Sequence, residues 1–178
     1  MKTMKTMMNL KTMMAGAMML FGMTTFAQKI TGSGDAAIDN YPQRFRLGVG
    51  IDGGIANSDY FNWSLGGDVR LQYDLTKKTS LTLTTGFTNL FGKDEIKDLG
   101  YIPAKLGFKA FVWGDQFYVV GEAGAGFAVT NGYDKTTFLW APGIGYALDP
   151  IDISLRYEGA NDFKADQVAL RIAYAFKL

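Results

Sequence analysis

Charged side chains fall on one parity of several alternating segments in this 178-residue chain, as Arg44 and Arg46 do and again Asp68, Arg70 and Asp74. At that spacing they lie on one face of a strand, where arginine and glutamate can form ion pairs. Glu122 and Glu158 could in principle act as a general acid and base. The chain has no histidine and no cysteine, which excludes triads that use histidine as the base and metal sites built on these ligands. We therefore predict no enzyme, no metal site and no cofactor, and we interpret these charges as structural ion pairs.

Two other patterns resemble ligand sites only weakly. Residues 48–53 (GVGIDG) match G-x-G-x-x-G, but a dinucleotide site needs a helix to follow, and residues 55–60 are predicted to form a loop. Two acidic pairs in predicted loops could bind a divalent cation but are interpreted as solvated charge: Asp94 with Glu95, and Asp162 with Asp166. The 18 basic and 17 acidic residues nearly balance, so the composition predicts no nucleic-acid partner.

The methionines divide the chain into two parts, because all nine lie within the first 23 residues. Lys2, Lys5 and Lys11 precede an uncharged apolar stretch at residues 13–23, and residues 25–27 end in a small-x-small pattern. This predicts a Sec-type signal peptide over residues 1–27, since a spanning helix would need about 20 apolar residues. Residues 28–43 are polar and small, and we interpret them as a short periplasmic tail.

From residue 44 onward the sequence alternates with a period of two. Phe45, Leu47, Val49 and Ile51 share one parity, while arginine, glycine and aspartate occupy the other. The same pattern recurs in residues 63–74, 81–91, 102–112, 117–129, 138–148, 151–158 and 167–178. Both parities are apolar in residues 138–148, and there we assign Phe138, Trp140, Ile144 and Tyr146 to the apolar face. Eight strands with two different faces are therefore predicted.

The apolar face could pack inside a soluble barrel or face lipid outside a membrane barrel. Its aromatic residues lie near strand ends, as Trp63 and Tyr73 do. Ten residues at about 3.3 Å each, tilted by about 40°, rise roughly 25 Å, which is the height of the apolar band of a membrane barrel. Amphipathic rings favour the two membrane interfaces. We predict an interface girdle of Trp63, Tyr73, Phe117, Phe127, Trp140, Tyr146, Tyr157 and Tyr174.

Short and long connections alternate along the chain. Short turns are predicted at residues 76–79, 114–115 and 149–150, and longer loops at residues 53–62, 92–100, 131–136 and 159–166. This asymmetry is typical of a transmembrane barrel and places the short turns on the periplasmic side. The last strand reaches Leu178 and can close against the first, because no sheet edge stays open in lipid. The predicted fold is therefore all-β, an eight-stranded antiparallel up-and-down transmembrane β-barrel over residues 44–178.

The charged parity would then face the lumen. It carries Arg44, Arg46, Arg70, Lys105, Lys109, Arg156, Arg171 and Lys177 with Asp52, Asp68, Asp74, Glu122, Asp152 and Glu158. An eight-stranded barrel is just wide enough for side chains to fill, and buried charges persist only when they are paired. We predict a structural ion-pair network that plugs the lumen, made by Arg70, Glu122, Arg156, Glu158, Arg171, Lys105 and Lys109. A leaky polar path through this network is the alternative.

Four segments resemble the small eight-stranded outer-membrane β-barrel family of Gram-negative bacteria, which includes porin-like proteins. They are residues 101–107 (YIPAKLG), 117–124 (FYVVGEAG), 141–146 (APGIGY) and 155–158 (LRYE), and the resemblance covers about residues 44–178. It implies an outer-membrane location, contact with outer-membrane lipid, insertion by the barrel-assembly machinery and a monomeric state. The chain ends in Leu178, where such barrels often end in phenylalanine.

Three functions fit this pattern. We predict an integral outer-membrane protein with a plugged lumen that acts as a structural or interaction element through its extracellular loops. A small, weakly selective channel is the first alternative, and a soluble periplasmic ligand-binding barrel is the second.

Overall fold

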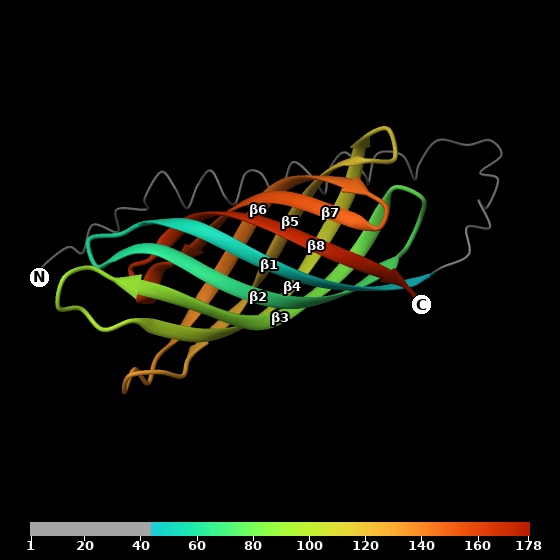
Figure 1. The fold of residues 1–178 in the computed structure, drawn as a ribbon. Coiled ribbons are helices and arrows are strands. Elements are labelled where there is room, and N and C mark those ends of the chain that lie inside the picture. The colour runs from blue at the N-terminus through green and yellow to red at the C-terminus, as the bar shows by residue number, and fades with distance from the viewer. Residues whose placement is uncertain (1–43) are drawn as a thin grey trace, which may run out of the picture. The chain divides into compact units, whose positions relative to one another are not determined.

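A computed structural model describes residues 44–178 as a closed barrel of eight antiparallel strands in sequence order (Figure 1). The strands are β1 (Phe45–Asn57), β2 (Phe61–Asp74), β3 (Thr79–Gly92), β4 (Leu99–Trp113), β5 (Phe117–Ala128), β6 (Thr136–Leu148), β7 (Ile151–Ala160) and β8 (Asp166–Lys177), with a 3-10 turn, η1 (Asn161–Phe163), after β7. The predicted all-β barrel is confirmed. The predicted signal peptide and polar tail lie outside the described residues. Among residues 44–178, no helix is long and apolar enough to cross a bilayer.

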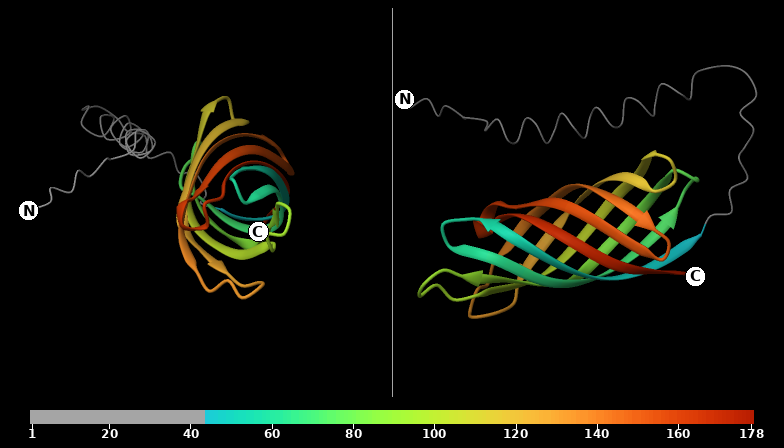
Figure 2. Two further views of the ribbon diagram at one scale, coloured as in Figure 1. Left: turned by 90° about the vertical axis from the view of Figure 1, so that its left-hand side faces the viewer. Right: turned by 45° about the horizontal axis from the view of Figure 1, so that its top comes forward.

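The sheet closes because β1 pairs with both β2 and β8, so every strand has two neighbours. The closed ring is visible along the axis in Figure 2. The stagger of the sheet follows from the residues that lie opposite one another on neighbouring strands. Starting at Asp52 on β1 and moving from each residue to its partner on the next strand, through β2, β3 and β4, one reaches Ala128 on β5. Moving from Asp52 around the barrel in the other direction, through β8, β7 and β6, one reaches Tyr118 on β5. The two routes end ten residues apart on the same strand, so the sheet closes with a stagger of ten residues. This stagger tilts the strands by about 35–45° and leaves an interior that side chains fill.

Side chains alternate between an exposed outer face and a buried lumen along every strand. On β2, Leu65 and Val69 are exposed, whereas Asp68 and Arg70 between and beside them are buried. The alternation also settles the ambiguous segment in β6. Phe138 is 58% exposed and Leu139 0%, so the outward set on this strand is the assigned one.

The two ends of the barrel differ in their connections. The loop end carries residues 58–60, 93–98, 129–135 and 161–165, and the turn end carries residues 75–78, 114–116 and 149–150 together with the C-terminus (Figure 1). The long loop predicted over residues 53–62 is therefore wrong, because β1 continues to Asn57. Ile55, predicted to lie in that loop, pairs with Trp63 and Val168. The strand can continue because the inward positions Gly54 and Ala56 are small: a Cβ on Gly54 would lie 2.7 Å from Ser64 Oγ.

Candidate functional site

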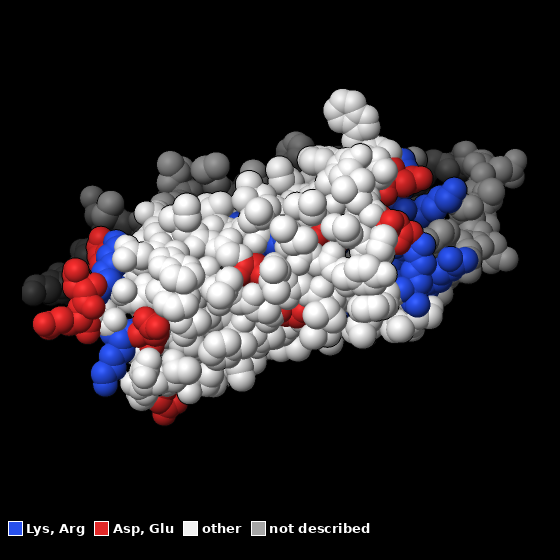
Figure 3. All heavy atoms as spheres, viewed as in Figure 1, with Lys and Arg blue, Asp and Glu red and all other residues white. Residues whose placement is uncertain are grey.

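The outer surface of the barrel is apolar between two charged rims. Exposed aliphatic side chains cover the middle of the strands, among them Ile51, Leu106, Leu155 and Leu170. Figure 3 shows lysine, arginine and carboxylate side chains gathered at the two ends, with an almost uncharged flank between them. An apolar surface of this extent is unusual on a soluble monomer and is the expected lipid-facing band of a membrane barrel.

The aromatic residues predicted to form a girdle lie on this outer face at two levels. Trp63, Phe127, Trp140 and Tyr157 lie toward the loop end, and Tyr73, Phe117, Tyr146 and Tyr174 lie toward the turn end. Four ring contacts strengthen the two levels: Trp63–Phe91 at 3.8 Å, Trp140–Tyr157 at 5.3 Å, Phe45–Tyr73 at 4.8 Å and Tyr174–Phe176 at 4.7 Å between centroids. Sequence reasoning missed Phe91, Phe45 and Phe176, although they share the parity of their partners.

Glu122, on β5, lies at the centre of the lumen and is almost completely buried. Arg70 donates from Nη2 to both of its carboxylate oxygens at 3.0 Å, and Thr84 donates from Oγ1 at 2.7 Å. Arg156 Nη1 donates to the same carboxylate at 3.3 Å. The glycine at position 107 provides the room, because a Cβ there would lie 2.7 Å from Glu122 Cγ. Glu122 therefore joins β2, β3 and β7 across the lumen.

The other predicted lumen residues form ion pairs around this centre. Arg171 donates to the two oxygens of Asp68 at 2.6 and 2.5 Å. Lys109 donates to Asp152 at 2.8 Å, and Lys105 donates to Glu158. The structure thus brings all seven predicted network residues into buried ion pairs, with Asp68 and Asp152 as additional partners.

The predicted inward set is wrong at its ends. Arg44 and Lys177 are exposed at the turn end, and Lys177 pairs with the exposed Asp149 outside the lumen. Arg46 is partly exposed and pairs with Asp74 at 3.0 Å. Arg44 and Lys177 lie at strand termini outside the lumen, whereas Arg46 faces inward at the rim, where its partner Asp74 is buried.

Two lumen tyrosines complete the hydrogen-bonding of the carboxylates. Tyr101 Oη donates to Glu158 and Tyr118 Oη donates to Asp152, both at 2.6 Å. Lys109 Nζ lies 3.7 Å from the centre of the Tyr118 ring. Sequence reasoning did not assign these tyrosines to the lumen, although Tyr118 shares the parity of Glu122 and Tyr101 that of Lys105.

An apolar cluster closes the lumen at the loop end, above the ion pairs. Its buried members are Ala56, Phe61, Leu90, Leu99, Tyr101, Leu139, Ala160, Phe163 and Ala165. Phe163 comes from η1, so the β7–β8 connection folds over the barrel mouth, where Phe163 packs against Tyr101 at 5.4 Å between ring centres. The predicted plug contained only charges. The sequence does contain a sign of this apolar cluster, because Leu90 and Leu139 are apolar residues on the lumen-facing parity.

A small cavity of about 10 Å³ lies within the network, lined in part by Asp52, Lys105, Arg156 and Glu158. That volume is at the lower limit for one water molecule. Asp52 is 7% exposed, and its carboxylate makes no hydrogen bond or close ion pair with any other of residues 44–178. Asp52 is the one lumen carboxylate of residues 44–178 outside the hydrogen-bonded network.

We expect Asp52→Asn to change the free energy of unfolding by less than about 1 kcal/mol, or to raise it, because no arginine or lysine loses a hydrogen-bonded partner. Asp68→Asn is the matched comparison, since it removes the charge that Arg171 contacts with two hydrogen bonds. Urea unfolding of both variants in lipid vesicles measures the difference. A cost for Asp52→Asn equal to that of Asp68→Asn would contradict this account.

Of the two acidic pairs at the loop end, Asp94 and Glu95 are exposed, whereas Asp162 and Asp166 make structural contacts. Asp166 accepts hydrogen bonds from Tyr157 Oη and the Ala160 amide, and Asp162 accepts one from Thr137 Oγ1. Within residues 44–178, no group of three or more potential ligands could hold a metal ion. The G-x-G-x-x-G match lies inside β1 and is followed by more strand.

A closed eight-stranded barrel with an apolar outside and charged inside defines a small transmembrane β-barrel, the class found in outer membranes.

No protein-family model matches the sequence, and no curated protein does. Among solved structures, the barrel is similar to Ail, the attachment invasion locus protein of Yersinia pestis. The crystal structure of Ail with the heparin analogue sucrose octasulfate aligns over 75% of this chain and 99% of Ail, with 14% identity and a TM-score of 0.55. The structure of Ail in a phospholipid bilayer nanodisc aligns over 76% of this chain and 100% of Ail, with 17% identity and a TM-score of 0.51. The chain therefore has the fold of the small outer-membrane β-barrels.

Proposed function

We propose that this protein is an integral outer-membrane barrel with a closed lumen, which acts as a structural or interaction element through its loop end. The observation that carries the proposal is the filled interior. Ion pairs occupy the middle of the lumen, the apolar cluster fills the loop end, and the cavity within the ion-pair network measures about 10 Å³. A pore needs a continuous aqueous path, so the filled interior favours the plugged barrel over the channel.

The outer surface supports the location. Aromatic rings at two levels border the apolar band, as expected for side chains at two membrane interfaces. The turn end and the C-terminus would face the periplasm, and the loops would face outward. A soluble barrel would expose this apolar surface to water, which argues against the ligand-carrier alternative.

The charge of the loop end bears on its partner. Seven acidic residues lie there, Asp59, Asp94, Glu95, Asp98, Asp134, Asp162 and Asp166, against four basic ones, Lys93, Lys97, Lys135 and Lys164. Ail has been crystallised with a polyanion, sucrose octasulfate. The acidic excess here disfavours a polyanionic ligand by simple charge repulsion and favours a neutral or basic partner surface.

Recording in a planar bilayer tests the closed lumen. The purified folded barrel is expected to give no steady conductance in concentrated KCl, because buried ion pairs and the apolar cluster block the axis. A mobility shift between unheated and boiled gel samples confirms that the inserted protein is folded. Steady open conductance from the folded protein would replace the closed barrel by the channel, and release from membranes by carbonate without detergent would favour the soluble carrier.

A further inference from the structure

The side chains of residues 44–178 give the two ends of the barrel opposite net charge. Among residues 44–178, the turn end has five basic side chains, Arg44, Arg46, Lys77, Lys78 and Lys177, and three acidic ones, Asp74, Asp115 and Asp149. The loop end has the acidic excess described above. Figure 3 shows basic side chains clustered at the turn end. An excess of basic residues at one membrane surface attracts anionic lipid headgroups.

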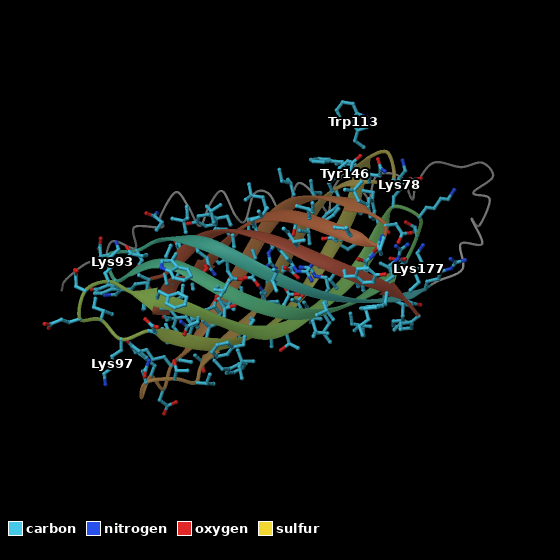
Figure 4. The ribbon with its side chains drawn as sticks, in the orientation of Figure 1. Lys78, Lys93, Lys97, Trp113, Tyr146 and Lys177 are labelled. Carbon is cyan, nitrogen blue, oxygen red and sulfur yellow. The ribbon has the colours of Figure 1, made fainter. Side chains whose placement is uncertain are left out.

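One corner of the turn end combines these cations with exposed apolar side chains. Trp113 is 82% exposed, and Figure 4 shows it pointing away from the barrel near Tyr146 and Lys78. The register between β4 and β5 shifts between Phe111 and Trp113. Such a bulge re-aims side chains, and here the consecutive residues Val112 and Trp113 are both exposed. The apolar band of β4 is thereby extended to the rim.

The β2–β3 turn places two lysines beside this extension. The Phe111 amide donates to the Lys78 carbonyl at 2.7 Å, which ties the turn to β4. Thr76 Oγ1 accepts from the amides of Lys78 and Thr79, each at 3.1 Å, and so orders the turn internally. Both lysine side chains are exposed, and among residues 44–178 neither ammonium forms an ion pair. They are therefore free to contact a ligand.

We propose that Lys77, Lys78, Val112 and Trp113, here called the basic–aromatic corner, bind an anionic phospholipid of the leaflet at the turn end. The inference rests on the proposed membrane location. The lysines contact the headgroup phosphate, Trp113 lies at the interface where indole rings favour the headgroup level, and Val112 contacts the acyl chain. A soluble anion would contact the lysines alone, whereas an anionic phospholipid contacts the lysines with its headgroup and Val112 with its acyl chain, so the amphiphile fits the whole corner.

Quenching of Trp113 fluorescence by brominated lipid tests this site. In Trp63→Phe/Trp140→Phe protein, Trp113 is the remaining tryptophan. Vesicles of phosphatidylcholine would contain equal small fractions of either brominated phosphatidylglycerol or brominated phosphatidylcholine. Brominated phosphatidylglycerol is expected to quench Trp113 more strongly than brominated phosphatidylcholine. The difference should correspond to a local enrichment of phosphatidylglycerol at the corner of ~5-fold for each of the two lysines. If the double variant does not fold, the difference between the parent and Trp113→Phe isolates the same signal.

Matched lysine variants distinguish lipid binding at the basic–aromatic corner from a general effect of the protein's positive charge. Lys77→Gln/Lys78→Gln is expected to bring the two brominated lipids to equal quenching, whereas Lys97→Gln/Lys135→Gln, at the loop end, retains the preference. Equal quenching in the unaltered corner, or a preference that survives Lys77→Gln/Lys78→Gln, would overturn the lipid site and leave membrane insertion intact. Absence of quenching by both lipids would overturn insertion and the lipid site together.

Discussion

Glu122→Gln is expected to lower the free energy of unfolding by about 3–5 kcal/mol, the cost of leaving buried charges without their partner. The substitution keeps the size of the side chain and removes its charge. Arg70 and Arg156 then remain buried beside a neutral amide, and Thr84 loses a charged acceptor. Equilibrium urea unfolding in lipid vesicles, followed by tryptophan fluorescence, measures the change.

Two variants serve as controls for this result. Asp52→Asn makes the same chemical change on a buried carboxylate outside the hydrogen-bonded network, so it isolates the effect of pairing from that of burial. Arg70→Met/Glu122→Leu removes Glu122 together with its closer arginine and should cost less than Glu122→Gln, because only Arg156 then loses this carboxylate and Arg156 still lies 3.8 Å from Asp68. If Glu122→Gln proves as mild as Asp52→Asn, the network does not stabilise the barrel through its ion pairs.

The barrel itself is predictable because the alternation of polar and apolar residues along each strand is visible in the sequence. A charge on one parity and an aliphatic residue on the next, as in Asp68 and Val69, specify two environments without knowledge of any contact. Even the ambiguous β6 follows once pairing is known, since Ala141 lies opposite the inward Glu122 and so faces the lumen. The eight strands and their antiparallel order therefore follow from local pattern and short connections.

The partners within the lumen cannot be read in this way. Arg70 and Glu122 are 52 residues apart on β2 and β5, which are not neighbouring strands. Which side chains meet across the lumen depends on the stagger of the closed sheet, and stagger is a property of all eight pairings together. The sequence pattern therefore predicts which residues share the lumen but leaves their pairing open.

The loop-end closure and the basic–aromatic corner depend on local irregularities. Phe163 reaches the lumen only because η1 folds over the barrel mouth, and Trp113 points outward only because of a bulge. Alternation gives no position for a residue outside a regular strand. The early end predicted for β1 has a related cause, because its glycines read as loop residues although small side chains suit the crowded inward face.

The second large effect is expected on the outside, where Leu106→Arg should destabilise the inserted barrel by about 2–4 kcal/mol. Leu106 is the central residue of β4, is 69% exposed, and pairs with the outward-facing Leu83 and Ala123. In the proposed location the arginine would enter the lipid band near its middle, where a charge loses its hydration. Equilibrium unfolding of the barrel from lipid vesicles by guanidinium measures the cost.

The same substitution at a rim separates a lipid-facing surface from a water-facing one. Leu148 lies on the outer face at the turn end and is 47% exposed, so Leu148→Arg is expected to cost only about 0–1 kcal/mol. A barrel surrounded by water would accept arginine equally at both positions, since neither side chain is enclosed by protein. Small and equal costs at Leu106 and Leu148 would therefore contradict the membrane location, whereas a cost that rises from the rim to the middle of the apolar band follows directly from a hydrocarbon layer around the strands.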